Sequence, residues 1–267
     1  MSLSADPGGA APAWPAGVAR VVLDEVDSTM ADAARRAPGL AGPAWILARR
    51  QTAARGRRGR PWVNPEGNFA ATLVFRPTGD AASAARQSFV AALALADVLA
   101  ALAPAAEVAL KWPNDVLVVG RKVSGILLES AGAGRALDHL AIGIGVNLAH
   151  APPTEALDPG ALPAIALAEV TGTVFPPEAF LDRLAPAVAR WQAVHEAEGF
   201  APIRAAWLAR AARLGETITA RIGRETLTGR FEGLDDTGAL VLATPEGTRA
   251  IPAADIHLPA PRGPAVR

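Results

Sequence analysis

The sequence predicts an α+β fold, in which a mixed β-sheet domain with flanking helices is followed by a small antiparallel β-barrel. At 267 residues the chain has room for one large domain and one small domain. Segments of strand and helix character fill the first 213 residues, whereas short strands separated by turn signals begin at Gly215. We therefore expect a flexible leader at 1–18, a main domain at 19–213 and a C-terminal domain at 214–267.

The first part of the main domain reads as three strands around one helix. The strands are expected at 21–26, 45–48 and 69–75, and the polar residues 27–29 provide capping groups for a helix that runs to Arg36. A basic loop at 49–62 connects the second strand to the third. Binding residues commonly lie on such loops.

The middle of the chain combines a core helix with further strands. The spacing of apolar residues predicts a buried helix over 83–103, and the apolar stretch at 89–106 is too short and too polar to span a bilayer. Strands are expected at 108–112, 116–119, 122–130 and 139–147, and Pro113 ends the first of them.

The last segments are two helices and the barrel. Helices are expected at 177–199 and 201–213, the first with an apolar face. The expected barrel strands are 217–222, 226–231, 239–242 and 248–251, which are separated by Gly, Asp and Pro turn signals.

The composition excludes several classes of protein. There are 26 basic and 26 acidic residues, so the chain lacks the overall positive charge expected of a nucleic-acid-binding protein. It has no cysteine, and its four histidines are too scattered for a metal site. The N-terminal residues do not form a signal-peptide pattern. We therefore expect a cytoplasmic protein with no membrane association.

The distribution of positive charge is the most informative feature of the sequence. The chain has two lysines, Lys111 and Lys122, and both lie in one short segment, whereas six arginines fall within 49–60. A compact ammonium group suits the stabilisation of one developing negative charge, and guanidinium groups beside Gly56 and Gly59 suit phosphate oxygens. Chance in an arginine-rich composition and a solvated basic face are the alternatives.

Four motifs occur in one order along the chain. They are Asp-Ser-Thr at 27–29, the arginine loop at 49–62, Lys-Trp-Pro-Asn-Asp at 111–115 and Gly-Ile-Gly-Val-Asn at 143–147. Together they closely resemble the biotin–protein ligases, and the segment from about Leu214 to Pro259 more loosely resembles the small SH3-like C-terminal domain of that family. Some relatives carry an N-terminal DNA-binding domain, but the 26 residues before Asp27 are too few for one, so we expect the monofunctional type.

The resemblance implies a set of site residues. The residues implied for biotin are Ser28, Thr29, Met30, Gln51, Arg55, Gly56, Arg57 and Lys111. The residues implied for ATP or the adenylate are Arg58, Arg60, Trp62, Asn114, Lys122 and Asn147. Lys111 and Arg57 are the expected catalytic residues, and Asp115 is a candidate for Mg²⁺ directly or through water, although an Asn-Asp turn needs no metal. Ala54 and Met30 depart from the family pattern, in which Gly and Asn are usual.

The implied reaction uses biotin and ATP as substrates with Mg²⁺. Biotinyl-5′-AMP forms and then acylates a lysine of the biotin carboxyl carrier domain of acetyl-CoA carboxylase or a related carboxylase. Lys111 suits the charge that develops on the α-phosphoryl group. We expect no DNA partner, and a homodimer through an edge strand is compatible with the sequence. The alternatives are a lipoate–protein ligase or octanoyltransferase of related fold and a non-enzymatic nucleic-acid-binding module.

Overall fold

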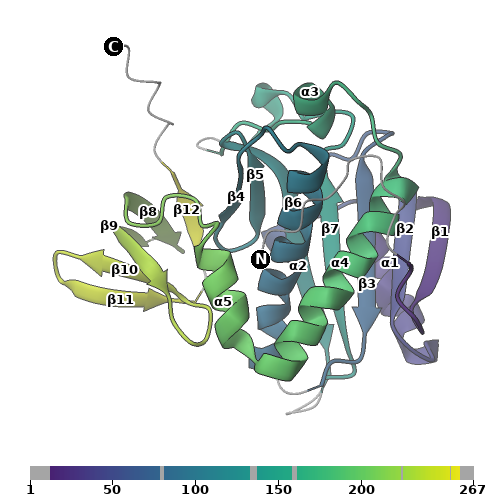
Figure 1. The fold of residues 1–267 in the computed structure, drawn as a ribbon, viewed down its shortest axis with the longest axis horizontal. Helices are drawn as coiled ribbons and strands as arrows, with labels where there is room; N and C mark the ends of the chain where they lie inside the picture. Colours follow the sequence, from purple (N-terminus) through teal and green to yellow (C-terminus); the bar gives the residue numbers. More distant parts are fainter. Residues whose placement is uncertain are drawn as a thin grey trace.

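The computed structural model describes residues 13–78, 81–132, 137–157, 161–223, 225–252 and 254–258. Residues 1–12 of the expected leader lie outside the described residues. The described chain forms two β-sheets with helices packed on the larger one, which confirms the predicted α+β class (Figure 1).

The larger sheet has seven strands in the order β1-β2-β3-β7-β6-β5-β4. The strands are β1 (Ala19–Val26), β2 (Ala44–Gln51), β3 (Phe69–Phe75), β4 (Val108–Lys111), β5 (Asp115–Val118), β6 (Arg121–Ala131) and β7 (His139–Val146). β1 pairs in parallel with β2, and the other neighbours are antiparallel. The sheet is therefore mixed, as predicted.

The helices divide between the two faces of this sheet. They are α1 (Thr29–Arg36), α2 (Ala81–Leu102), α3 (Leu167–Thr171), α4 (Pro177–Glu198) and α5 (Phe200–Leu208), with short 3-10 turns at Ala37–Gly39, Arg57–Gly59 and Thr154–Ala156. The long helices α2 and α4 pack together over one face (Figure 1). α1 contacts β2, β3 and β7, and its residues form a separate apolar cluster with side chains of the opposite face, such as Ile46 and Val74. Since α1 is short, it leaves part of this second face open.

The C-terminal segment forms a five-stranded antiparallel sheet in the order β11-β10-β9-β8-β12. Its strands are β8 (Thr217–Ile222), β9 (Glu225–Leu234), β10 (Leu240–Thr244), β11 (Gly247–Ile251) and β12 (Asp255–His257). The sequence predicted four of these strands and missed β12, which is short and follows a proline. Closure of this sheet into an SH3-like barrel remains a prediction.

The two sheets share one buried apolar cluster. It includes Trp112 of the main domain together with Ile218 and Phe231 of the C-terminal sheet. The Trp112 indole Nε1 donates a 3.0 Å hydrogen bond to the carbonyl oxygen of Gly238, and a Cβ atom on Gly238 would lie 2.8 Å from the Phe89 ring. The expected domain boundary near residue 213 therefore separates two β-sheets along the sequence, but both sheets contribute side chains to one hydrophobic core.

Several predicted boundaries differ from the structure. The strand expected at 45–48 runs to Gln51, and the strand expected at 226–231 runs to Leu234. The strand expected to include Trp112 ends at Lys111, and residues 112–114 form the turn to β5. The helix expected to run to Arg213 ends at Leu208, after which Ala212 donates its N–H to the carbonyl oxygen of Leu110.

One helix in the described part of the chain, Ala82–Leu102, has the length and apolar composition of a membrane span. About 67% of its apolar window is buried inside the protein, however. Core helices have the same composition, so this helix carries no indication of a membrane.

Candidate active site

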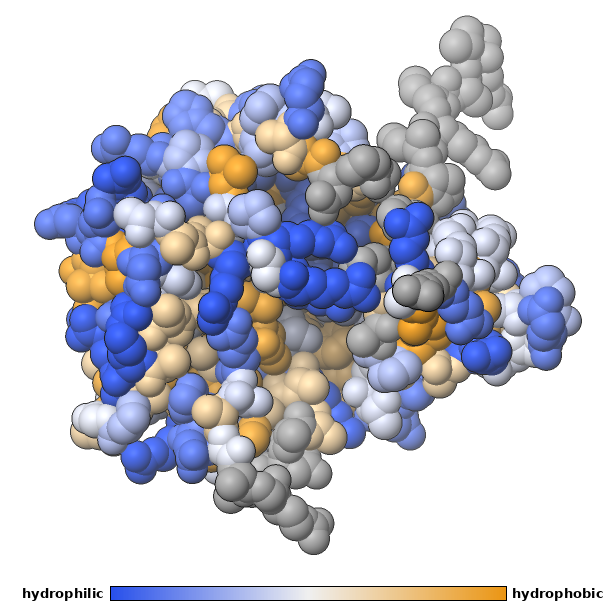
Figure 2. All heavy atoms as spheres, turned by 180° about the vertical axis from the view of Figure 1, so that it is seen from behind, coloured by the Kyte–Doolittle hydropathy of each residue, from blue (hydrophilic) through white to orange (hydrophobic). Residues whose placement is uncertain are grey.

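The open part of the α1 face contains a cavity of about 670 Å³. The face opposite α2 and α4 is hollowed near its centre, and hydrophilic side chains border the hollow (Figure 2). The cavity lies over strands β6 and β7 and beneath the loop at 54–63. Among the described residues, its lining includes six basic side chains and one acidic side chain, so it suits an anionic ligand.

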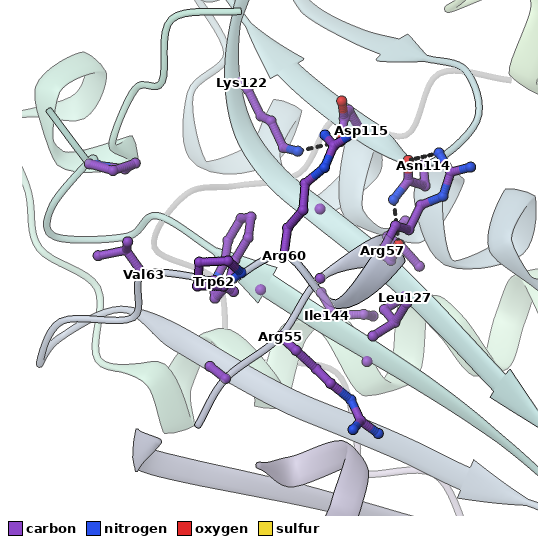
Figure 3. A pocket seen from close by; sticks show the side chains of 18 of the residues that line it. Arg55, Arg57, Arg60, Trp62, Val63, Asn114, Asp115, Lys122, Leu127 and Ile144 are labelled. Carbon is purple, nitrogen blue, oxygen red and sulfur yellow. Dashed lines mark hydrogen bonds and ion pairs between the residues drawn. The ribbon is translucent and has the colours of Figure 1, made fainter. Parts of the chain in front are cut away.

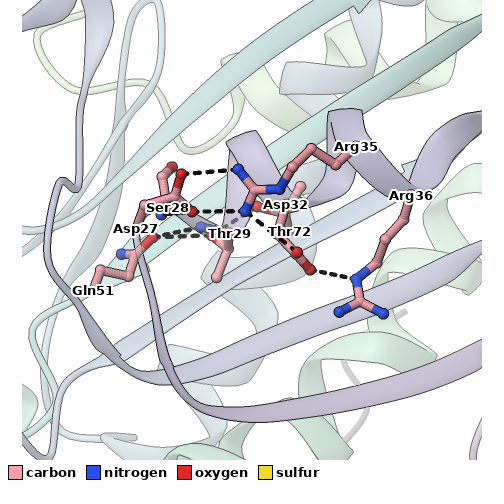
Figure 4. Close-up of polar contacts among 8 residues, drawn as sticks. All are labelled: Asp27, Ser28, Thr29, Asp32, Arg35, Arg36, Gln51 and Thr72. Atoms are coloured by element: carbon pink, nitrogen blue, oxygen red, sulfur yellow. Dashed lines mark hydrogen bonds and ion pairs between the residues drawn. The ribbon is translucent and has the colours of Figure 1, made fainter.

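One end of the cavity combines polar and apolar groups. Ser28 and Thr29 are buried at the start of α1, where Ser28 is the N-cap residue. The Thr29 backbone N–H donates to Gln51 Oε1 at 2.8 Å, which connects α1 to the end of β2 (Figure 4). Beside them, the Arg35 guanidinium holds the pKa of Asp27 well below its usual range, and Asp27 Oδ1 accepts the Ser28 N–H at 2.8 Å.

The glycines of the fourth motif make room for two large side chains. A Cβ atom on Gly143 would lie 2.6 Å from Met30 Sδ, and a Cβ atom on Gly145 would lie 2.6 Å from the Trp62 indole. Real Cβ contacts are essentially never this short, so no side chain fits at either position unless its neighbour moves. The motif is glycine-rich because a thioether and an indole lie against the sheet there.

The arginine loop forms a small hairpin over the cavity. Gly56 donates its N–H to the carbonyl oxygen of Arg60, and Trp62 donates to that of Ala54, at 2.7 and 3.0 Å. Arg58 and Gly59 of this hairpin are in the left-handed region, with φ of 58° and 71°. Ala54 does not have a positive φ, so the methyl group that replaces the usual glycine hydrogen causes no backbone strain.

Both lysines of the chain contact one buried carboxylate. Asp115 Oδ1 lies 2.6 Å from Lys122 Nζ, and Asp115 Oδ2 lies 3.1 Å from Lys111 Nζ. Burial raises the pKa of Asp115, but the two ammonium groups more than offset this effect, so its pKa falls to about 2. Lys122 is the more exposed lysine, at 30% against 12% for Lys111, and its Nζ also lies 5.6 Å from the Trp62 ring centroid.

Arg57 links the loop to both domains. Its Nη1 donates to Asn114 Oδ1 at 3.4 Å and approaches the carbonyl oxygen of Ala254 at 3.5 Å. Asn114 Nδ2 in turn donates to the carbonyl oxygen of Ile126 at 2.6 Å. In Figure 3 the side chains of Arg57 and Asn114 point toward one another, whereas the side chain of Arg55 points away from them. Arg55 Nη2 lies 3.0 Å from Glu129 Oε2, with which it forms an ion pair.

Asn147 presents an acceptor without a partner. Its side chain is buried, and its Nδ2 donates to the carbonyl oxygen of Ile165 at 3.3 Å. Asn147 Oδ1 has no hydrogen-bond partner in the described part of the structure. Since an unsatisfied buried acceptor is costly, this oxygen at the cavity wall suits a ligand N–H group.

The structure brings the predicted site residues together. All of them line the cavity except Arg58, which is exposed on the outside of the hairpin. Trp112 of the third motif lies in the core and does not line the cavity. The sequence did not indicate Arg221 and Ile256 of the C-terminal sheet, nor the segment of Leu162 and Ala164, because these residues belong to none of the motifs.

The comparisons with known proteins agree with this arrangement. Residues 22–147 match the model of the Biotin/lipoate A/B protein ligase family, and residues 214–258 match the Biotin protein ligase C terminal domain. The chain is 60% identical over 236 residues to the biotin–[acetyl-CoA-carboxylase] ligase of Paracoccus denitrificans, which covers 88% of this chain and 98% of that protein. It is 31% identical over 217 residues to the bifunctional ligase/repressor BirA of Bacillus subtilis, covering 80% of this chain and 65% of that protein.

A solved structure resembles the whole described fold. The biotin protein ligase of Aquifex aeolicus in complex with biotin and ATP aligns with a TM-score of 0.76 and 27% identity, covering 89% of this chain and 97% of that one. The fold, the cationic cavity and these similarities together define an enzyme of the adenylate-forming ligase class. The chain belongs to the biotin protein ligase family.

Proposed function

We propose that this enzyme joins biotin to a lysine of a biotin carboxyl carrier domain through a biotinyl-5′-AMP intermediate. The observation that carries the proposal is a single cavity with two different ends. The buried hydroxyls of Ser28 and Thr29 and the partly buried Gln51 amide form one end beside Met30. The Lys111–Asp115–Lys122 cluster forms the other. A ring system with a few polar groups suits the first end, and a phosphate chain suits the second.

The polar end favours biotin over lipoate. A ureido ring offers one carbonyl acceptor and two N–H donors, which match the hydroxyl of Thr29 and the amide of Gln51. The dithiolane ring of lipoate offers no comparable hydrogen-bonding groups. Lipoate would therefore leave buried polar atoms unpaired, which costs about 1–3 kcal/mol for each group.

The cationic end supports adenylate formation. A carboxylate oxygen of biotin attacks the α-phosphorus of ATP, the bond to the bridging oxygen breaks, and pyrophosphate leaves. Lys111, Lys122 and Arg57 provide positive charge at the phosphate end, where negative charge increases in the transition state. The carrier lysine then attacks the acyl carbon as a neutral amine, and AMP leaves with its phosphate as the leaving group.

The adenine ring has suitable partners on the same wall. Asn147 Oδ1 is a buried acceptor for an exocyclic amine, and the Trp62 indole, which lies over Gly145, lines the same cavity. The deprotonated phosphate oxygens of a nucleotide cannot donate to Asn147 Oδ1, whereas N–H and O–H groups of its nucleoside part can. We assign Asn147 and Trp62 to the nucleoside part of ATP.

The residues around Asp115 do not fit direct ligation of Mg²⁺. Both carboxylate oxygens of Asp115 contact lysine ammonium groups. In the described part of the chain, no group of three or more His, Cys, Asp or Glu side chains is placed to hold a metal ion. Mg²⁺ commonly binds through the phosphates of its nucleotide and keeps several waters, so we assign Mg²⁺ to ATP and derive no step through a protein-bound metal.

The remaining assignments follow from the family and the surface of the protein. We assign a cytoplasmic location, a carboxylase carrier domain as partner, and no operator DNA. The large sheet has two edge strands, β1 and β4. Because Leu110 of β4 already forms hydrogen bonds with Arg210 and Ala212, β1 is the edge of this sheet that we assign to a homodimer. Light scattering of the purified chain measures that state directly.

Biotin-dependent exchange of labelled pyrophosphate into ATP tests the proposed function. We expect exchange with biotin and Mg²⁺ and none with lipoate or octanoate. A carrier domain added with biotin and ATP should gain one biotin, whereas its Lys→Arg variant should gain none. Equal exchange with lipoate would assign the chain to the lipoate branch, and an absence of exchange with every acid would contradict an adenylating enzyme.

A further inference from the structure

A buried hydroxyl of β3 lies behind the polar end of the cavity. Alternate residues of β3 face the α2–α4 core, among them Phe69, Ala71 and Leu73. Thr72 faces the opposite side, where it is fully buried and lies opposite Gly143 in the strand register. Thr72 belongs to none of the four sequence motifs and does not line the cavity.

Thr72 begins a directional series of hydrogen bonds. Its hydroxyl donates to Thr29 Oγ1 at 2.9 Å, and the Thr29 hydroxyl donates to Gln51 Oε1 at 3.2 Å (Figure 4). The Thr29 backbone N–H donates to the same Gln51 oxygen at 2.8 Å. Gln51 Oε1 therefore accepts two hydrogen bonds from one residue.

This series determines which way the Gln51 amide faces. Because Gln51 Oε1 is held by Thr29, its Nε2 group is the end left for the cavity. The proton of Thr72 occupies a lone pair of Thr29 Oγ1, which directs the Thr29 proton toward Gln51. Without the Thr72 donor, the Thr29 hydroxyl is free to rotate, and Gln51 Oε1 then keeps only the hydrogen bond from the Thr29 backbone N–H.

We propose that Thr72 is a positioning residue for biotin binding, which acts through Thr29 to orient the Gln51 amide as a donor toward the ureido carbonyl oxygen. Thr72 itself touches no ligand. The inference rests on the proposed function, because it concerns the ring end of the cavity. It goes beyond that function because it assigns the donor orientation of the Gln51 amide to Thr72, a residue of β3 that does not line the cavity.

The test is calorimetric titration of biotin into the full chain and three variants. Thr72→Val replaces the hydroxyl with a methyl group of similar shape and should weaken biotin binding by about tenfold. Thr72→Ser keeps the donor and should stay within about threefold of the parent. Ile142→Val removes one core methylene on the neighbouring strand, away from the hydrogen bonds, and should leave biotin affinity unchanged at a comparable loss of stability.

A double-mutant cycle separates positioning from a general structural role. Gln51→Ala removes the group on which Thr72 is proposed to act, so adding Thr72→Val to Gln51→Ala should weaken biotin binding by less than about twofold further. An ATP KM that changes in parallel with biotin affinity would overturn the inference. So would a Thr72→Val affinity within threefold of the parent, full additivity with Gln51→Ala, or equal losses for Thr72→Ser and Thr72→Val.

The parent protein distinguishes the two levels of failure. If the parent binds biotin and Thr72→Val binds it equally well, Thr72 has no positioning role and the proposed function stands. If the parent binds no biotin, the proposed function fails, and the inference fails with it. Thr72→Ala provides a second hydroxyl deletion if Thr72→Val does not fold, and it should give the same loss of biotin affinity.

Discussion

Replacing Asp115 with asparagine should lower the stability of the protein in a pH-dependent way. The change removes the one acidic side chain among the described residues that line the cavity, and it leaves Lys111 and Lys122 without their shared counterion. The pKa of Asp115 is lowered from 3.8 to about 2 in the folded protein, which corresponds to about 2 kcal/mol of stability at pH 7. The loss of one partner from a buried ion pair costs about 3–5 kcal/mol, which sets the upper end of the expected range.

The sign of the pH dependence follows from the direction of the shift. The folded-state pKa is depressed, so the stabilisation is fully present above the unfolded-state value of 3.8 and is lost as the pH falls through about 2. The difference between parent and Asp115→Asn should therefore be about 2 kcal/mol or more at pH 7. It should shrink to roughly half of that value at pH 3.

Urea unfolding followed by tryptophan fluorescence measures this difference at pH 7 and pH 3. Other carboxylates, Asp27 included, titrate equally in both proteins and cancel in the comparison. Asp236→Asn is the matched control, because Asp236 pairs with Arg204 at an almost fully exposed position and should have no measurable effect. A difference below about 0.5 kcal/mol at pH 7, or one that does not change with pH, would refute the reasoning.

Three further changes test separate parts of the structure. Lys111→Ala and Lys122→Ala should each reduce adenylate formation by roughly 100-fold without unfolding the protein, and parent-like pyrophosphate exchange would remove that lysine from the mechanism. Arg221→Ala should raise the KM for ATP by about threefold to tenfold and leave the KM for biotin unchanged. Arg230→Ala is the control, because Arg230 lies on the same sheet outside the cavity and its loss should change neither KM. Val119→Asn should raise the unfolding free energy by about 1 kcal/mol. Val119 has φ of 45° before Gly120, a left-handed conformation that asparagine adopts more readily than a β-branched residue. A lower melting temperature for Val119→Asn would contradict this expectation.

The motifs predicted the assembly of the site well because each contains chemistry that a strand or helix does not need. Paired glycines, clustered arginines and the two lysines have no evident structural use in sequence. The structure places Gly143, Gly145, both lysines and three of the six clustered arginines around one cavity. Arg49 and Arg50 form ion pairs with acidic side chains outside the cavity instead. The partners that support them were not predictable in the same way. A threonine within a strand, such as Thr72, satisfies β propensity equally well whether or not its hydroxyl has a role.

Arg221 illustrates a second reason for incomplete prediction. It alternates with buried Ala220 on an ordinary strand of the C-terminal sheet, a pattern that indicates a solvent-facing position. It reaches the cavity because the C-terminal sheet packs against the main domain through Trp112 and Arg57. Packing between domains depends on the shapes of both surfaces, and neither the period nor the composition of one strand contains that information.

Met30 shows how the structure explains a departure that the sequence left open. In sequence, Met30 in place of the usual asparagine predicts the loss of a polar contact at the ligand site. In the structure its thioether occupies the space above Gly143 and packs with Ala33 and Ala141 in the apolar cluster under α1. The cavity therefore has an apolar floor next to the polar groups of Thr29 and Gln51. Such a floor suits the hydrocarbon and thioether part of a fused ring, so Met30 contributes shape where the usual asparagine contributes a hydrogen bond.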